Sequence, residues 1–163
     1  MKLYFLRHGV AEDPAPGQSD AERRLTADGV DAMRKEAAAL ARMGRKLDLI
    51  VTSPLPRASE TAQIVAEALG CADLVRFDQR LAPGFGMGEL RDLLADLPAP
   101  ESVMLVGHQP DLGAVSGRLV GAGMLDLKKG GLVRLSTESL EPGAAALEWL
   151  LPPSLLKLAG SKR

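Results

Sequence analysis

The chain alternates short, nearly continuous apolar runs with longer segments in which apolar residues recur every three or four positions. Continuous runs of about four to eight residues are typical of buried strands, and the longer spacing is typical of amphipathic helices. The runs predict strands at 3–6, 47–52, 74–77, 102–106, 131–136 and 145–150. Helical spacing, with flanking Gly and Pro residues, predicts helices at 27–43, 53–69, 89–97 and 110–120.

The order of these elements predicts the fold class. Strands and helices alternate along most of the chain, which is typical of a three-layer α/β/α sandwich with a mostly parallel sheet. No helix separates the last two strands, so we expect an antiparallel edge. The 163 residues suit one domain spanning 1–163, with a proline-broken, peripheral tail after about residue 151.

Composition and charge limit the classes of protein to which the chain can belong. The net charge is −1, from 20 basic and 21 acidic residues, so we expect neither a nucleic-acid surface nor a membrane anchor. Cys71 is the only cysteine, which excludes an intramolecular disulfide and argues against a cysteine-ligated zinc site. Since no leader pattern and no apolar run of about 20 residues occurs, we expect a cytoplasmic protein.

Both histidines of the chain come directly after an apolar strand. His8 follows the run 3–6 and has Gly9 behind it, and His108 follows the run 102–106 with Gly107 before it. Ligand crevices of α/β sheets open at the carboxyl ends of the strands. If the two strands are neighbours, we expect both imidazoles in one crevice.

Two arginines predict that this crevice binds an oxyanion. Arg7 precedes His8, and Arg57 lies in the first turn of a helix that we expect to begin at Ser53-Pro54. A cation is unfavourable at a helix N-terminus unless an anion binds there, where backbone N–H groups would also contact it. Guanidinium groups match phosphate geometry. The alternative, a zinc-binding histidine pair, is disfavoured because the arginines repel a cation and no third ligand is evident.

The long polar segment 10–25 is expected to be a functional rim or a mobile loop. We expect its charged side chains to be mainly solvated, although one of its arginines is within reach of the crevice. These side chains are Glu12, Asp13, Asp20, Glu22, Arg23 and Arg24.

Several sequence blocks together resemble a known family. They are Leu6-Arg7-His8-Gly9, Leu25-Thr26-x-x-Gly29, Ser53-Pro54-Leu55-x-Arg57-Ala58 and Val106-Gly107-His108. In this order and at these spacings they resemble the histidine phosphatase superfamily (phosphoglycerate mutase-like). The blocks Arg-His-Gly-x-Ala at 7–11, Asp20-x-x-Arg23, Leu81-x-Pro83-Gly84 and Gly107-His108-x-Pro110 are similar, more narrowly, to the SixA-type phosphohistidine phosphatases.

The resemblance implies a hydrolase in which His8 is the nucleophile and forms a phosphohistidine intermediate that water then hydrolyses. It implies that Arg7, Arg57 and His108 hold the phosphoryl oxygens, with no metal and no cofactor. The bound dianion would favour a protonated His108. The implied substrate is a phosphorylated histidine on a partner protein of signal transduction or sugar transport, such as a phosphorelay protein or phosphocarrier.

One departure from the family pattern bears on the substrate. Ester-cleaving members usually carry a glutamate acid where this chain has Pro83. An alkoxide needs a proton to leave far more than an imidazole does, so the departure favours a phosphoramidate substrate. An acid could still come from Glu12, Asp13, Asp78 or Glu89. A small-molecule phosphomonoesterase of the same fold and a non-catalytic module that binds phospho-ligands stay open as alternatives.

Overall fold

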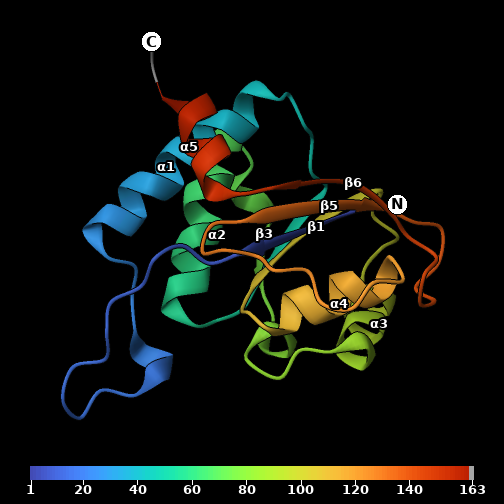
Figure 1. Ribbon diagram of the computed structural model, residues 1–163, viewed down its shortest axis with the longest axis horizontal. Coiled ribbons are helices and arrows are strands. Elements are labelled where there is room, and N and C mark those ends of the chain that lie inside the picture. Colours follow the sequence, from blue (N-terminus) through green and yellow to red (C-terminus); the bar gives the residue numbers. More distant parts are fainter. Residues whose placement is uncertain (162–163) are drawn as a thin grey trace.

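The computed structural model describes residues 1–161; the last two residues of the predicted domain lie outside them. Six strands form one sheet in the order β3-β2-β4-β1-β5-β6 (Figure 1). The strands are β1 (Lys2–Arg7), β2 (Leu49–Thr52), β3 (Val75–Phe77), β4 (Ser102–Gly107), β5 (Leu132–Ser136) and β6 (Ala146–Leu151). The helices are α1 (Ala27–Arg42), α2 (Pro56–Leu69), α3 (Met87–Ala95), α4 (Asp111–Leu119) and α5 (Pro153–Gly160), with 3-10 turns at Asp20–Glu22, Ala72–Leu74 and Gln79–Leu81.

Strands β1 to β4 pair in parallel, whereas β5 and β6 are antiparallel. Helices α1, α2 and α5 cover one face of the sheet, and α3 and α4 cover the other (Figure 1). This arrangement confirms the predicted three-layer α/β/α sandwich with a mostly parallel sheet and an antiparallel edge.

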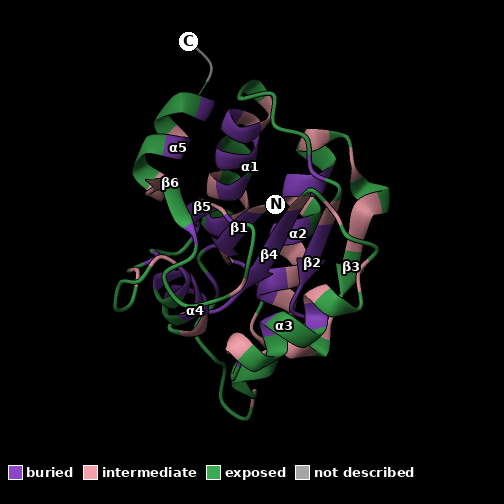
Figure 2. Cartoon of the chain, turned by 90° about the vertical axis from the view of Figure 1, so that its right-hand side faces the viewer, coloured by how far each residue is buried: buried purple, intermediate pink, exposed green. Residues whose placement is uncertain are grey.

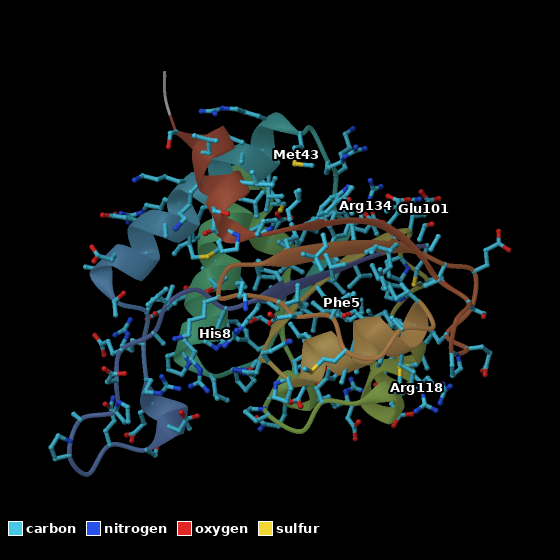
Figure 3. All side chains as sticks on the ribbon, in the orientation of Figure 1. Phe5, His8, Met43, Glu101, Arg118 and Arg134 are labelled. Carbon is cyan, nitrogen blue, oxygen red and sulfur yellow. The ribbon has the colours of Figure 1, made fainter. Side chains whose placement is uncertain are left out.

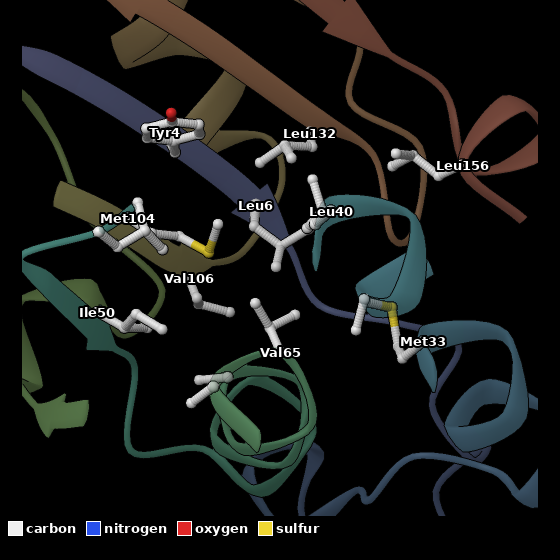
Figure 4. Close-up of a cluster of buried hydrophobic side chains, with 14 of the residues drawn as sticks. Tyr4, Leu6, Met33, Leu40, Ile50, Val65, Met104, Val106, Leu132 and Leu156 are labelled. Carbon is white, nitrogen blue, oxygen red and sulfur yellow. The ribbon is translucent and has the colours of Figure 1, made fainter. Parts of the chain in front are cut away.

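Alternating side chains of the strands pack into two separate hydrophobic cores, one on each face of the sheet. In β1, Tyr4 and Leu6 point toward α1 and α2, where Figure 4 shows them among Met33, Val65 and other buried residues. Leu3 and Phe5 of the same strand pack toward α3 and α4. Because side chains alternate along a strand, a central strand needs apolar residues at every position. Figure 2 accordingly shows β1, β4 and β2 almost entirely buried between the helix layers.

Two predicted helices begin at other residues than expected. Helix α2 begins at Pro56 and not at Ser53-Pro54, because the residue before a proline avoids the helical region and Leu55 is extended (φ −64°, ψ 135°). Helix α3 begins two residues earlier than predicted, because the Glu89 carboxylate accepts the backbone N–H of Gly86 at 3.0 Å and caps it.

The residues after Leu151, where we predicted a proline-broken, peripheral tail, form helix α5 (Figure 1). Pro153 occupies the first turn, where a missing N–H costs no helical hydrogen bond. Leu156 is buried in the core beside α1. Gly160 packs on the Lys35 carbonyl, which a Cβ atom would approach to 1.7 Å. The helix therefore depends on packing against α1, which the local sequence pattern does not reveal.

Helix α1 buries one carboxyl group, that of Glu36, which is 2% exposed. It lies against Gly130, where a Cβ atom would be 2.5 Å from Glu36 Oε2. The Gly130 N–H in turn donates to the carbonyls of Arg7 and His8, at 3.2 and 3.1 Å. Burial raises the pKa of Glu36 to about 8, although Lys157 on α5 acts in the opposite direction. The carboxyl group is therefore protonated at neutral pH.

The raised pKa of Glu36 predicts that the protein loses stability as the pH rises toward 8. Above pH 4.5 the unfolded chain releases this proton while the folded chain keeps it, so folding is favoured less at each higher pH until the folded group also ionises. Between pH 6.5 and 9 the free energy of unfolding should fall by about 2 kcal/mol more in the wild type than in Glu36→Gln. Urea unfolding at both pH values measures this difference, and equal slopes for the two proteins would contradict it.

Candidate active site

The register between β1 and β4 brings the two histidines together. Arg7 is paired with Gly107, and the His8 N–H donates to the Gly107 carbonyl at 3.1 Å. The imidazole rings of His8 and His108 lie 5.3 Å apart, centre to centre, and are tilted by 55°. Figure 3 shows His8 at the carboxyl end of the sheet, beside the long loop 10–25. The two imidazoles thus meet in one place, as predicted from the strand ends.

The His8 ring has a defined tautomer. Its Nδ1 lies 2.7 Å from the carbonyl oxygen of Gly9, which can only accept a hydrogen bond. Nδ1 therefore bears the proton, and the lone pair is on Nε2. Burial, with the charges of Arg57 and Arg7 nearby, lowers the pKa of His8 to about 3. The ring is neutral at physiological pH, with its unprotonated nitrogen available for attack.

His108 is held by Ser53, whose Oγ lies 2.8 Å from His108 Nε2. We expected Ser53 to begin the helix, but α2 begins later, at Pro56, and the Ser53 hydroxyl makes this contact instead. Burial, and then the charge of Arg57, lowers the pKa of His108 to about 4. Without an anion His108 is therefore neutral, so the protonated form expected from the resemblance requires a bound dianion to raise this pKa.

Arg57 projects from the first turn of α2, as predicted, and is 3% exposed. Its Nη1 donates to the Asp20 carbonyl at 2.7 Å, and its Nη2 donates to the Asp20 carboxylate at 2.9 Å. The same carboxylate accepts from Arg23 Nε at 2.9 Å and Nη2 at 2.6 Å. As expected, the charged residues of this loop are mainly exposed, and one arginine, Arg23, reaches the cavity. Asp20 in addition ties the loop to α2 through Arg57.

The N-terminus of α2 offers fewer free backbone donors than expected. Pro56 has no N–H, and the N–H groups of Ala58 and Ser59 both donate to the Leu55 carbonyl, at 2.9 and 3.0 Å. The contribution of this helix to an anion site is therefore mainly the Arg57 side chain that it presents.

These side chains surround a cavity of about 380 Å³. The cavity is lined by Arg7, His8, Asp20, Arg23, Arg57, Pro83, Gly84, His108, Gln109, Pro110, Asp111 and Lys129. Three of these side chains each have a buried nitrogen with no hydrogen-bond partner in residues 1–161: Arg7 Nε, Arg57 Nε and His108 Nδ1. An unpaired buried donor costs about 1–3 kcal/mol. A ligand with several acceptor oxygens, such as a phosphoryl group, suits this site.

The four carboxylates considered as proton donors are not among the residues that line the cavity in the described chain. Asp78 is paired with Arg80 at 2.7 Å, and Glu89 caps α3. Pro83, where the family resemblance implies that ester-cleaving members carry a glutamate, does line the cavity.

Sequence reasoning missed three residues of the cavity wall, of which one is Gln109. It did not consider Asp111, although this residue follows His108 by three positions, and it left Lys129 without a role. Only the motif Asp20-x-x-Arg23 signalled the loop residues. Within residues 1–161 no group of three or more His, Cys, Asp or Glu side chains could hold a metal ion, and no helix could cross a membrane.

A neutral imidazole beside two guanidinium groups, at the carboxyl ends of parallel strands, defines an α/β enzyme site for phosphoryl groups. The sequence family agrees with this class. The chain belongs to the histidine phosphatase superfamily (branch 1), whose model matches residues 3–89, and it is therefore a phosphatase or mutase type of enzyme.

Several relatives support this membership. An uncharacterized protein of Picosynechococcus sp. is 39% identical over 93% of this chain and all of its own length. The probable phosphoglycerate mutase GpmB of Serratia proteamaculans is 36% identical over 73% of this chain and 54% of its own. The phosphohistidine phosphatase SixA of Escherichia coli is 27% identical over 98% of both chains. A solved structure of the protein histidine phosphatase SixA complexed with tungstate covers 96% of this chain and 100% of its own, with a TM-score of 0.85 and 26% identity.

The low pKa values of the two histidines predict their titration directly. Since the chain contains only His8 and His108, two imidazole signals appear in an NMR spectrum, and His8→Gln assigns them. Both signals should titrate below pH 5, because burial disfavours the charged rings. Saturation with inorganic phosphate should raise the midpoint of His108. A midpoint near 6.5 for either ring in the phosphate-free protein would contradict the described burial.

The guanidinium of Arg57 should contribute to oxyanion affinity by its shape as well as its charge. Arg57→Ala should weaken tungstate binding by about 10- to 100-fold, the usual size of a lost charge-assisted hydrogen bond. Arg57→Lys should restore only part of this affinity, because an ammonium cannot form the planar fork. Isothermal titration calorimetry measures both. The double variant Asp20→Asn/Arg57→Ala is the control, because Arg57→Ala alone leaves the Asp20 carboxylate near the anion without its partner. Wild-type affinity in Arg57→Ala would exclude Arg57 from the anion site.

Proposed function

We propose that this chain is a phosphohistidine phosphatase that hydrolyses phosphoryl groups from protein histidine through a phospho-His8 intermediate. The hydrogen bond from His8 Nδ1 to the Gly9 carbonyl is the observation that carries the proposal. It orients the ring and leaves Nε2 as an unprotonated nucleophile, which is the state that phosphoryl transfer to histidine requires.

The reaction then has two displacements at phosphorus. In the first, His8 Nε2 forms a bond to phosphorus while the bond to the substrate nitrogen breaks, and its electron pair stays on the leaving imidazole. In the second, water attacks phospho-His8 and releases inorganic phosphate and the free ring. Arg7, Arg57 and His108 hold the phosphoryl oxygens and stabilise the charge of both transition states, so the chemistry needs no metal.

The preference for phosphohistidine over an ester is supported by the wall of the cavity. Pro83, which can neither donate nor accept a side-chain proton, lies where a leaving-group acid is expected. An imidazole protonated before the reaction leaves as a neutral group and does not need that acid. Similarity to SixA proteins over nearly the whole chain favours the same substrate class. The partner is therefore proposed to be a histidine-phosphorylated signalling or phosphocarrier protein.

The test compares wild type, His8→Ala and His108→Gln on a phosphohistidine-bearing phosphocarrier and on p-nitrophenyl phosphate, with a chelator present. Wild type should release phosphate from phosphohistidine, and His8→Ala should lose about a thousandfold or more of this activity because the nucleophile is gone. Rapid quenching and mass spectrometry should detect a phosphorylated enzyme in wild type and in His108→Gln, but not in His8→Ala.

Other outcomes would select the alternatives. Faster turnover of small phosphate esters than of phosphohistidine would indicate a small-molecule phosphomonoesterase. Tight binding of the phosphorylated protein without phosphate release would indicate a non-catalytic binding module. Loss of activity on chelation would contradict the metal-independent mechanism.

A further inference from the structure

The cavity contains a carboxylate that anion binding does not explain. Of the two acidic residues that line it, Asp20 is paired with Arg57 and Arg23. Asp111 forms no ion pair with any residue between 1 and 161. Its Oδ2 accepts the backbone N–H of Gly84 at 2.7 Å, and its Oδ1 has no side-chain hydrogen bond in that part of the chain. A carboxylate in a phosphoryl-binding cavity repels the ligand, so its presence there is unfavourable unless it meets a donor.

The exposure of the lining residues indicates that Asp111 lies nearer the mouth of the cavity than the residues around the phosphoryl site. His8 and His108 are 6% and 4% exposed, whereas Asp111 is half-buried and Gly84 is exposed. Asp111 begins α4, on the opposite face of the sheet from α2 and its Arg57. In an in-line displacement the leaving nitrogen lies on the far side of phosphorus from His8 Nε2. Since His8 is deep in the cavity, the leaving group projects toward the mouth.

We propose that the Asp111 carboxylate binds the leaving imidazole, accepting a hydrogen bond from the ring nitrogen that does not bear the phosphoryl group. This assignment rests on the proposed phosphohistidine phosphatase function. Before reaction both ring nitrogens are substituted, one by the phosphoryl group and the other by a proton, so the ring is positively charged. When the phosphorus–nitrogen bond breaks, its electron pair neutralises the ring, and the N–H remains on the other nitrogen, bonded to Asp111.

Asp111 therefore recognises the leaving group and transfers no proton. An ionised carboxylate favours the protonated, positively charged ring over the neutral one, and it thereby selects the form of phosphohistidine that leaves most easily. A phosphate ester offers no such N–H group, so Asp111 is a specificity residue for phosphoramidates. It occupies the cavity wall beside Pro83, where an acid for esters is lacking.

The test measures Asp111→Asn on two substrates, a synthetic phosphohistidine peptide and p-nitrophenyl phosphate. Asn is nearly isosteric and keeps an acceptor for the Gly84 N–H, so the wall should stay in place. The kcat/KM for phosphohistidine should fall by about 10- to 100-fold, the size of a lost charge-assisted hydrogen bond, while that for p-nitrophenyl phosphate should stay within about threefold. Asp92→Asn, an exposed α3 carboxylate outside the cavity lining, is the matched control and should change neither.

Two further readouts separate leaving-group recognition from a structural role. The alkaline limb of kcat for phosphohistidine should move down by about one pH unit in Asp111→Asn, because the bound ring loses the charge that favours its protonation. The affinity for inorganic phosphate should change little, because the substitution removes a charge that repels phosphate and also a charge that favours protonation of His108, whereas a distorted site would bind phosphate much more weakly.

The outcomes distinguish this proposal from the one on which it rests. If the wild type hydrolyses phosphohistidine and Asp111→Asn does so at the same rate, only the proposed role of Asp111 is wrong. Equal losses of kcat/KM on both substrates in Asp111→Asn, or much weaker binding of inorganic phosphate, would also contradict the proposed role of Asp111. If the wild type does not hydrolyse phosphohistidine at all, both proposals are wrong.

Discussion

The parallel pairing of β1 with β4 is the constraint on which the site depends. Arg7 lies opposite Gly107, so both strands end at the same level and the next residues, His8 and His108, are neighbours. The pairing cannot slip by one residue, because each strand has alternate side chains in two different cores and a slip would exchange them. Hydrophobic packing on both faces of the sheet therefore fixes the distance between two polar rings at its edge.

Burial at that edge determines the charge of each group. Imidazoles shielded from water beside guanidinium groups lose their protons, whereas guanidinium groups stay charged. The site thus combines neutral histidines with permanently charged arginines. Asp20 offsets part of the positive charge and holds Arg57 and Arg23 in place. It also fastens the loop 10–25 to α2, so the loop is part of the wall of the site.

The sequence allowed the fold and the central residues to be predicted because each rests on a local pattern. Apolar runs ending in Arg7-His8 and Gly107-His108 identify strand ends, and Arg57 follows a proline-marked helix start. Contacts between distant segments have no such pattern. The pairing of Asp20 with Arg57 spans 37 positions, and the packing of α5 on α1 spans more than 100. The residues that hold the site's side chains in place and adjust their charge depend on such contacts between distant segments.

Pro83 and Asp111, which lie beside each other in the cavity wall, suggest a common principle for its selectivity. An enzyme for esters must deliver a proton to an alkoxide, which requires a carboxylic acid kept protonated near the leaving oxygen. A phosphorylated imidazole brings its own proton, and an ionised carboxylate holds that proton better than a neutral acid does. Pro83 in place of the donor and Asp111 as an acceptor are thus two parts of one arrangement. The leaving group explains both residues. A phosphorylated imidazole already carries its proton, so it requires a hydrogen-bond acceptor for its N–H group and not a proton donor.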